Sequence, residues 1–224
     1  MTFAERALSF YRELRIGNPL PDGIEVLNPY QDETSFALCQ AFYRKYYNEN
    51  LERFFILGIN PGRFGGGITG VPFTDPIKLE MICGIKNRFP KKAELSANFI
   101  HAMIAAFGGP DKFFSKFYIN SVSPLGLIKS GKNLNYYDTP QLMKFLEPFI
   151  RDAIRTQLKF GINRKVAFCL GEGANFKYLQ KLNDQEKYFK QIIPLAHPRF
   201  IMQYKRKHLA HYLEDYLQKL NSVL

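Results

Sequence analysis

The amino-acid sequence predicts an α/β protein, with a mainly parallel four-stranded central sheet between two layers of helices. Four short apolar segments have the length and composition of strands that are buried on both faces. They alternate with helical stretches long enough to serve as the crossovers that parallel pairing requires. The 224 residues contain no linker rich in serine, proline or charge, so we expect a single domain over residues 1–224.

The first 50 residues are expected to form a helical lead-in to this sheet. Thr2 and Glu5 have the spacing of a capping box, and the helical stretch behind them ends near Arg15. A second helix is predicted over residues 35–47.

The four predicted strands cover residues 54–58, 117–121, 165–171 and 190–195. Helices are expected around residues 95–107, 140–159 and 173–182, with a last one at about 205–221. The second of these has the clearest ends, because Thr139 can cap it, Pro140 suits its first turn and Gly161 lies just past its end.

Polar residues and glycines follow the carboxyl ends of all four strands, which is where ligands bind in sheets of this kind. The first strand leads into residues 60–62 (Asn-Pro-Gly), and the second carries Asn120 at its end. The third runs into residues 171–173 (Gly-Glu-Gly), and the fourth is followed by His197. We therefore expect one site along this edge.

The segment after the first strand, "LGINPGRFGGGITGVPF" at residues 57–73, holds six glycines. The spacing matches neither a dinucleotide fingerprint nor a P-loop, so a nucleotide cofactor is the weaker interpretation. Asn-Pro-Gly alone is also a common tight turn. Pro72 then holds Phe73 where its ring could stack on a flat heterocycle. Glycine at this density lets a backbone approach a ligand closely.

Three side chains are candidates for the chemistry of this site. Asn60 is neutral and cannot act as a general base, but its carbonyl oxygen can position a water. Asn120 offers the donor and acceptor that read an amide-like edge such as that of uracil; taken alone, a backbone-capping role is slightly favoured. His197 could donate to a developing oxyanion, and a histidine satisfied within the core is the ordinary alternative.

Other conspicuous residues are assigned structural roles. Asp75 is expected to cap the helix that starts at Pro76. His208 and His211 lie three apart without an evident third ligand, so a surface position is favoured over a metal site. The three cysteines, Cys39, Cys83 and Cys169, fit neither a disulfide frame nor a zinc or iron-sulfur pattern, which indicates a reducing compartment and no metal.

The formal net charge is +11, which favours binding to a polyanion, although plain solubility charge explains it equally well. Arg199, Lys205, Arg206 and Lys207 follow His197 closely and lead into the last predicted helix, where phosphates could bind. A solvated helix face is the alternative for the lysines. Phe200 could wedge into a base stack or, equally, dock the last helix.

Three motifs together carry a family resemblance. "GINPGRFGGGITGVPF", then "NSVSPLG", then "AHPRF" resemble the single-strand-selective monofunctional uracil-DNA glycosylases, a branch of the uracil-DNA glycosylase superfamily, from about residue 53 to the C-terminus. Arg199 and Phe200 replace the usual Ser-Pro of the histidine motif, and Arg63 stands where an apolar residue or proline is usual. We assign the chain to a divergent bacterial-type subgroup.

The resemblance implies a role for each matching residue. Asn60 would help to place the attacking water, and His197 would stabilise charge on the departing base. Phe73 would stack on that base, Asn120 would read its edge, and Ile59 and Gly62 would line the pocket. The expected DNA contacts are Arg63, Arg199, Phe200, Lys205, Arg206 and Lys207. The family fold agrees with the predicted sheet, and the family uses no cofactor.

The expected activity is therefore hydrolytic excision of uracil, or of a related deaminated or oxidised base, from DNA, which leaves an abasic site. The partner would be damaged DNA, and we expect a soluble monomer in the cytoplasm, associated with the nucleoid if the source is bacterial, and no membrane contact. The alternatives are a non-catalytic DNA-binding protein of the same fold and a nucleoside hydrolase.

Overall fold

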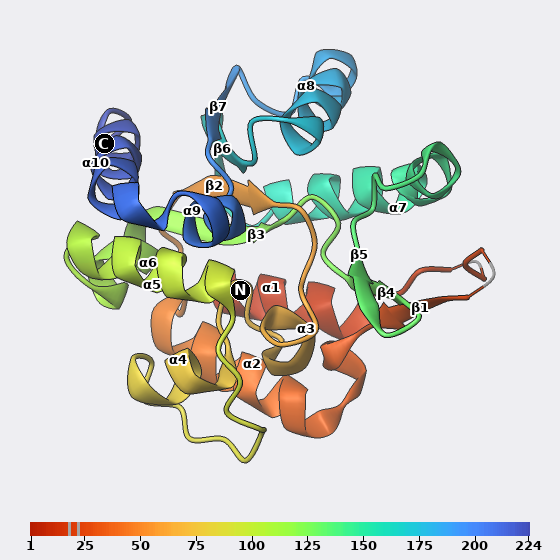
Figure 1. Ribbon diagram of the computed structural model, residues 1–224, viewed down its shortest axis with the longest axis horizontal. Helices are drawn as coiled ribbons and strands as arrows, with labels where there is room; N and C mark the ends of the chain where they lie inside the picture. Colours follow the sequence, from red (N-terminus) through yellow and green to blue (C-terminus); the bar gives the residue numbers. More distant parts are fainter. Residues whose placement is uncertain (18, 22) are drawn as a thin grey trace.

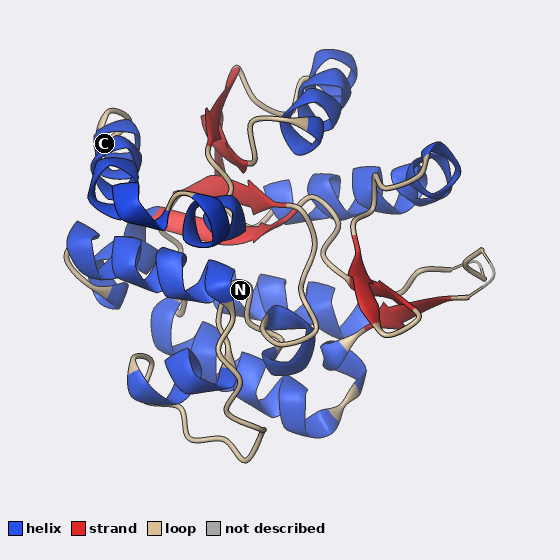
Figure 2. Ribbon diagram, viewed as in Figure 1, coloured by secondary structure: helices blue, strands red, loops and turns tan. Residues whose placement is uncertain are grey.

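A computed structural model describes residues 1–17, 19–21 and 23–224, and its centre is a parallel sheet (Figures 1 and 2). The sheet has the strand order β3-β2-β6-β7. Its strands are β2 (Arg53–Gly58), β3 (Phe117–Ser121), β6 (Ile162–Leu170) and β7 (Gln191–Leu195). The four predicted strands are confirmed, with ends that differ by at most three residues.

The register of the sheet brings the strand ends together. Leu57 of β2 lies beside Asn120 of β3 on one side and Cys169 of β6 on the other. Cys169 in turn lies beside Pro194 of β7. Because all four strands run parallel, the loops that follow them emerge along one edge, as the sequence predicts.

Helices flank the sheet, and in the view of Figure 1 α8 lies above it and α1 and α2 lie below it, which confirms the three-layer prediction. The predicted helices correspond to α1 (Phe3–Glu13), α2 (Glu33–Tyr46), α5 (Leu95–Phe107), α7 (Pro140–Leu158), α8 (Ala174–Glu186) and α10 (Leu209–Asn221). The helix expected to begin at Pro76 is α4 (Pro76–Met81), and η2 (Arg206–His208) lies within the range predicted for the last helix. Short helices that were not predicted are η1 (Pro29–Gln31), α3 (Gly66–Thr69), α6 (Pro110–Lys116) and α9 (Pro198–Tyr204).

The predicted helix ends follow from capping chemistry. The Thr2 hydroxyl accepts the backbone N–H of Glu5, and the Glu5 carboxylate accepts the N–H of Thr2, which completes the capping box. Thr139 accepts the N–H of Leu142 at the start of α7. Asp75 caps α4 through the N–H of Lys78, as predicted. One buried hydrophobic cluster runs from α1 to α10, so the N-terminal helices are part of the core.

A second, antiparallel sheet was not expected from the sequence. It consists of β1 (Ile24–Leu27), β4 (Gly126–Lys129) and β5 (Lys132–Leu134) in the order β1-β4-β5, and it projects from the main body (Figure 2). The strands have only three or four residues, and β1 and β5 are largely exposed, so they lack an apolar signal. This small sheet matters because β5 lies beside the loop that follows β2.

Candidate active site

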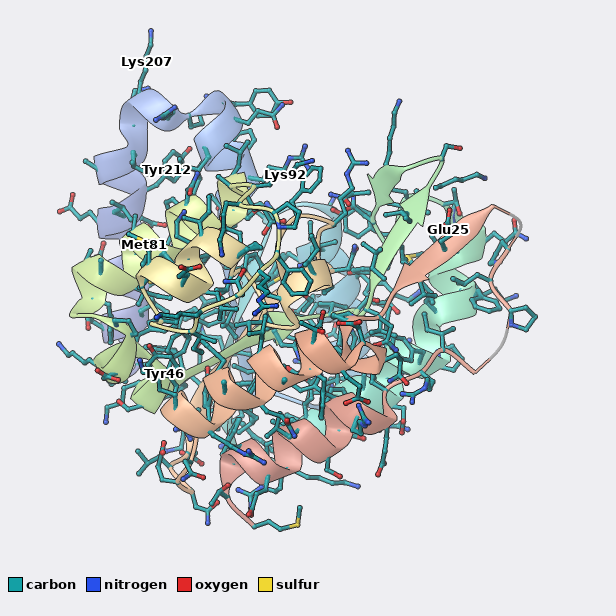
Figure 3. The ribbon with its side chains drawn as sticks, turned by 90° about the horizontal axis from the view of Figure 1, so that it is seen from below. Glu25, Tyr46, Met81, Lys92, Lys207 and Tyr212 are labelled. Carbon is teal, nitrogen blue, oxygen red and sulfur yellow. The ribbon has the colours of Figure 1, made fainter. Side chains whose placement is uncertain are left out.

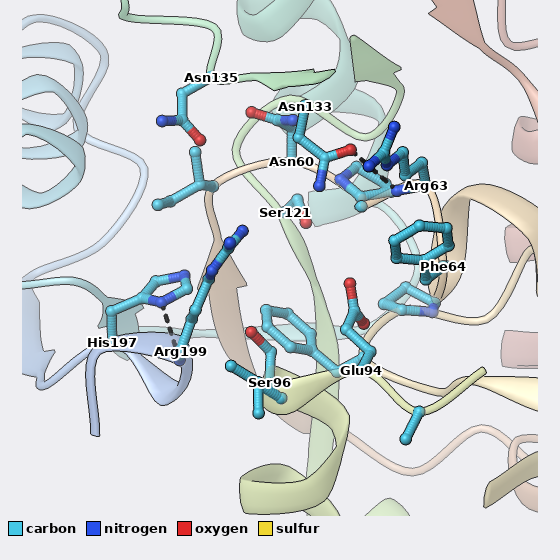
Figure 4. Close-up of a pocket in the computed structure, with 18 of the residues that line it drawn as sticks. Asn60, Arg63, Phe64, Glu94, Ser96, Ser121, Asn133, Asn135, His197 and Arg199 are labelled. Atoms are coloured by element: carbon cyan, nitrogen blue, oxygen red, sulfur yellow. Dashed lines mark hydrogen bonds between the residues drawn. The ribbon is translucent and has the colours of Figure 1, made fainter. Parts of the chain in front are cut away.

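The carboxyl edge of the main sheet holds a cavity of about 430 Å³, a size typical of small-molecule sites (Figure 4). Its walls come from the glycine-rich loop after β2, the residues at the start of α5, the end of β3, the β5 region and the start of α9. Ile59, Asn60, Gly62, Phe73 and His197 all line it. Five of the six residues expected for chemistry and base binding therefore share one cavity.

Phe73 is held in the cavity by tight packing against the end of β2. A Cβ atom added to Gly58 would collide with the Phe73 ring, so only glycine lets the ring lie this close to the strand. Phe73 itself has a positive φ of 54°, a strained conformation for a residue with a bulky side chain. Such strain persists only where the surroundings over-determine it, and it clusters at binding sites.

Asn60 is fixed in orientation by the unpredicted β5 segment. Its side-chain amide donates to the carbonyl oxygen of Leu134 at 3.1 Å, and its carbonyl oxygen accepts the N–H of Tyr136 at 3.2 Å. A carbonyl oxygen has two lone pairs, so the Asn60 oxygen can accept one more hydrogen bond, such as that of a water. The neutral amide can therefore hold a water in a defined place without acting as a base.

His197 stands at the N-cap of α9, where its Nδ1 accepts the backbone N–H of Arg199 at 3.2 Å. This bond assigns the proton of the neutral ring to Nε2, which becomes a hydrogen-bond donor. Burial, together with the nearby Arg199 guanidinium, lowers the pKa of His197 to about 4. The ring is therefore neutral at physiological pH and can donate to an oxygen that gains negative charge.

Asn120 does not reach the cavity, and the prediction that it reads the base edge is corrected by the structure. The side chain is fully buried, and its amide donates to the hydroxyl groups of Tyr11 and Tyr118 and to the side chain of Gln157. Its carbonyl oxygen accepts the N–H of Ser121. Successive side chains of a strand point to opposite faces, so Asn120 faces the core.

Ser121 takes the place that was assigned to Asn120. It is the next residue of β3, it lines the cavity, and its hydroxyl offers one donor and two acceptor positions (Figure 4). The alternation of side chains along the strand was the signal that could have distinguished the two. From sequence alone, however, the alternation does not show which of two adjacent residues faces the cavity, unless it is known which face of the strand is buried.

Sequence reasoning also missed several polar and aromatic residues of the cavity wall, namely Phe64, Glu94, Ser96, Asn133 and Asn135. Asn133 positions the glycine-rich loop, because its side-chain oxygen accepts the N–H of Arg63 at 3.1 Å. The guanidinium carbon of Arg63 lies over the Phe64 ring, 4.6 Å from the ring centroid. Phe64 lies within the glycine-rich motif, although no role is predicted for it there. No motif marks the other four, which come from the region of β5 and from the start of α5.

The basic residues fall into two groups. Arg63 and Arg199 line the cavity itself, and in Figure 4 the Arg199 side chain extends towards its centre. The second group lies outside the cavity and is exposed: Lys205 stands between α9 and η2, and Arg206 and Lys207 are on η2. Figure 3 shows Lys207 extending into solvent. The exposed aromatic residue Phe200 is on α9. Phe200 lies next to Tyr204, with ring centroids 5.8 Å apart.

Among the described residues, no group of three or more histidine, cysteine, aspartate or glutamate side chains could hold a metal ion. The three cysteines are free and buried. Burial raises the pKa of Cys83 to about 11 and that of Cys169 to about 12, so both remain thiols and are poor nucleophiles. In the described part of the chain, no helix is long and apolar enough to cross a membrane.

Comparisons with known proteins agree with this geometry. Residues 44–221 match the model of the uracil DNA glycosylase superfamily. The crystal structure of wild-type Pedobacter heparinus SMUG2 superimposes with a TM-score of 0.96 and 46% sequence identity, over 100% of this chain and 98% of that one. None of the curated proteins searched matches the sequence. The resemblance carried by the three motifs is confirmed, and the chain belongs to the uracil DNA glycosylase superfamily.

Proposed function

We propose that the cavity accepts a uracil, or a related deaminated or oxidised base, flipped out of DNA and hydrolyses its N-glycosidic bond. Membership of the superfamily supports DNA glycosylase activity as part of base excision repair. One observation carries the assignment of the site. A neutral histidine with its Nε2–H free and an asparagine with a fixed side-chain oxygen line the same cavity, next to an aromatic ring.

The reaction places opposite charges on its two products. As the bond between C1′ and the base nitrogen breaks, the electron pair leaves with the base, and positive charge develops on the sugar. The His197 Nε2–H donates to the base oxygen that gains negative charge, an interaction that strengthens towards the transition state. A water held by Asn60 then adds to C1′. The water proton neutralises the base, so the products are a free base and an abasic site.

A flipped base costs a few kcal/mol of stacking and pairing energy, least where the base is mispaired or single-stranded. Stacking on Phe73 offsets part of this cost. We expect Arg63 and Arg199 at the cavity, and Lys205, Arg206 and Lys207 near the start of the last helix, to bind the phosphates on either side of the flipped nucleotide. Phe200 is exposed on α9, and its ring could fill the space that the flipped base leaves in the DNA base stack.

Lys132 lines the cavity from β5, but its side chain is exposed to solvent. A lysine that forms a Schiff base is normally activated by burial or by a cationic neighbour that lowers its pKa. Lys132 is not buried in this way, which supports hydrolysis by water and a monofunctional enzyme. Borohydride should trap no covalent complex with DNA; a trapped complex would show that a lysine attacks the sugar.

The activity is tested with an end-labelled oligonucleotide that carries one uracil, incubated with excess enzyme at low salt and then heated in alkali. Cleavage at the uracil is expected. Uncleaved product would refute uracil excision, and a panel with xanthine, hypoxanthine or 5-hydroxymethyluracil would then decide among related bases. The Asn60→Ala and His197→Ala variants should lose excision and keep DNA binding, whereas His208→Ala, at an exposed histidine, serves as the matched control.

A further inference from the structure

The carboxyl group of Glu94 is the one acidic side chain among the described residues that line the cavity. Glu94 stands just before α5, at the N-cap position, but its side chain makes no capping hydrogen bond. Its backbone N–H donates to the Asp75 carboxylate at 2.9 Å, which anchors the residue. The side chain is thereby free to turn into the cavity, and Figure 4 shows its carboxyl group pointing inward.

The glycine-rich loop makes room for this side chain. A Cβ atom added to Gly65 would collide with Oε2 of Glu94, and one added to Gly62 would collide with Oε1. The carboxyl group therefore lies directly against the loop. Asn60 projects instead towards β5, where both ends of its amide are bonded. The Glu94 side chain thus lies against the glycine-rich loop, whereas Asn60 remains the residue expected to position the water.

Neither oxygen of the Glu94 carboxyl accepts a hydrogen bond from any described residue, and the half-buried side chain keeps both oxygens available to a ligand in the cavity. Charged groups approach from four other parts of the chain: Asp75 before α4, Arg199 on α9, Arg63 in the loop after β2 and Lys132 on β5. Burial and the Asp75 carboxylate raise the pKa of Glu94 to about 7, against the opposing effect of Arg199.

We propose that Glu94 is a base-binding residue whose neutral carboxyl group donates its O–H to an oxygen of the flipped base and accepts an N–H from it. This inference rests on the proposed glycosylase function. Glu94 would supply the paired donor and acceptor for the base edge that the sequence analysis expects of Asn120. Ser121 would be a second, smaller polar group in contact with the base. The ligands are bases with a C=O next to an N–H, a group shared by uracil, hypoxanthine and xanthine.

Electrostatics favours the neutral form in the complex. The base departs with negative charge, and a carboxylate in contact with it would destabilise that charge by Coulomb repulsion. A carboxylic acid at the same place donates a hydrogen bond to the charged oxygen and so stabilises the transition state. Phosphate groups of bound DNA act in the same direction, because nearby negative charge favours the protonated acid.

The test is single-turnover excision of uracil from about pH 5 to pH 9 by the wild type, Glu94→Gln and Glu94→Ala. Wild-type excision should fall as the pH rises through about 7, because the donor proton is lost. Glutamine keeps a donor and an acceptor and cannot ionise. Glu94→Gln should therefore stay within a few-fold of the wild type at pH 6 and lose the fall at high pH, whereas Glu94→Ala should be slower by about 10- to 100-fold.

The outcomes are separable. If Glu94→Gln is as slow as Glu94→Ala at pH 6, or if wild-type excision rises through pH 7, the carboxylate form acts and the proposal for Glu94 is overturned. Absence of wild-type excision on every base of the panel overturns the proposed function, and the role of Glu94 with it. Glu80→Gln, at a partly exposed glutamate on α4, is the control and should leave the pH profile unchanged. Thermal unfolding verifies that all variants fold.

Discussion

Two neighbouring residues of β3 divide the polar chemistry of this molecule. Asn120 enters a closed network on the core side, where its amide bonds to Tyr11, Tyr118 and Gln157, and the Tyr11 hydroxyl bonds on to Tyr43 at 2.7 Å. Ser121 faces the cavity. The polar groups of this network find their partners within the protein, as burial requires.

The cavity side differs because its polar groups keep unused hydrogen-bonding capacity. His197 uses Nδ1 on a backbone N–H and keeps Nε2–H, and Glu94 has no hydrogen-bond donor among the described residues. Asn60 lies between the two cases, since both ends of its amide are held but one lone pair is free. The contrast teaches that unused hydrogen-bonding capacity, more than residue type, separates a binding group from a structural one.

The largest effect should come from the cavity side, at His197. His197→Ala removes a donor to the leaving base and should slow excision by about 10²- to 10³-fold. Near pH 7 the free energy of unfolding should fall by about 0.5–2 kcal/mol, because the variant loses the N-cap hydrogen bond to the Arg199 N–H. Because the folded-state pKa is lowered to about 4, wild-type stability should fall as the pH drops below the unfolded value of about 6.5, and the variant should lose this dependence. Single-turnover kinetics and pH-dependent denaturation measure both effects.

Asn120→Ala should have the opposite profile. Removing the amide leaves buried hydroxyl and carbonyl groups with fewer partners, so we expect a loss of about 1–3 kcal/mol in the free energy of unfolding. Excision per folded molecule should stay near the wild-type rate. A selective loss of excision without loss of stability would mean that Asn120 turns to the cavity when DNA binds.

Ser121→Ala is the matched substitution one residue along the strand, with a smaller effect. It removes one neutral hydrogen bond to the base, worth about 1 kcal/mol, so kcat/KM should fall by up to about tenfold. Stability to urea should be unchanged. If Ser121→Ala loses more stability than Asn120→Ala, the division of β3 into a core side and a cavity side is wrong.

The sequence was sufficient for the main sheet because its strands are continuous apolar runs, such as Phe54–Leu57, whose burial on both faces leaves a strong signal. The caps at Thr2, Asp75 and Thr139 were predictable for a similar reason, since capping depends on local spacing. The small antiparallel sheet was not predictable. Its strands have three or four residues, and their pairing is fixed by contacts distant in sequence.

The site was predictable where a residue is tied to a motif, as Asn60, Phe73 and His197 are, and all three line the cavity. The prediction of the site failed at Asn120, because its position depends on which face of the strand is buried. It also missed Glu94, whose side chain enters the cavity from a loop that carries no motif. The sequence alone does not distinguish a glutamate that faces solvent from one that lines a cavity. Only the packing of the glycine-rich loop distinguishes them.

A third kind of polar group, on the exposed surface beside the cavity, should show the smallest effect. Lys207 is exposed on η2 and extends into solvent, so it can contribute only a phosphate contact (Figure 3). Lys207→Gln should leave stability unchanged and lower the slope of log K against log salt by about one for DNA binding, measured from about 50 to 200 mM salt. Lys181→Gln on α8, an exposed lysine outside the cavity, is the control. An equal reduction for both would mean that binding reflects net charge alone, without a defined DNA face beside the cavity.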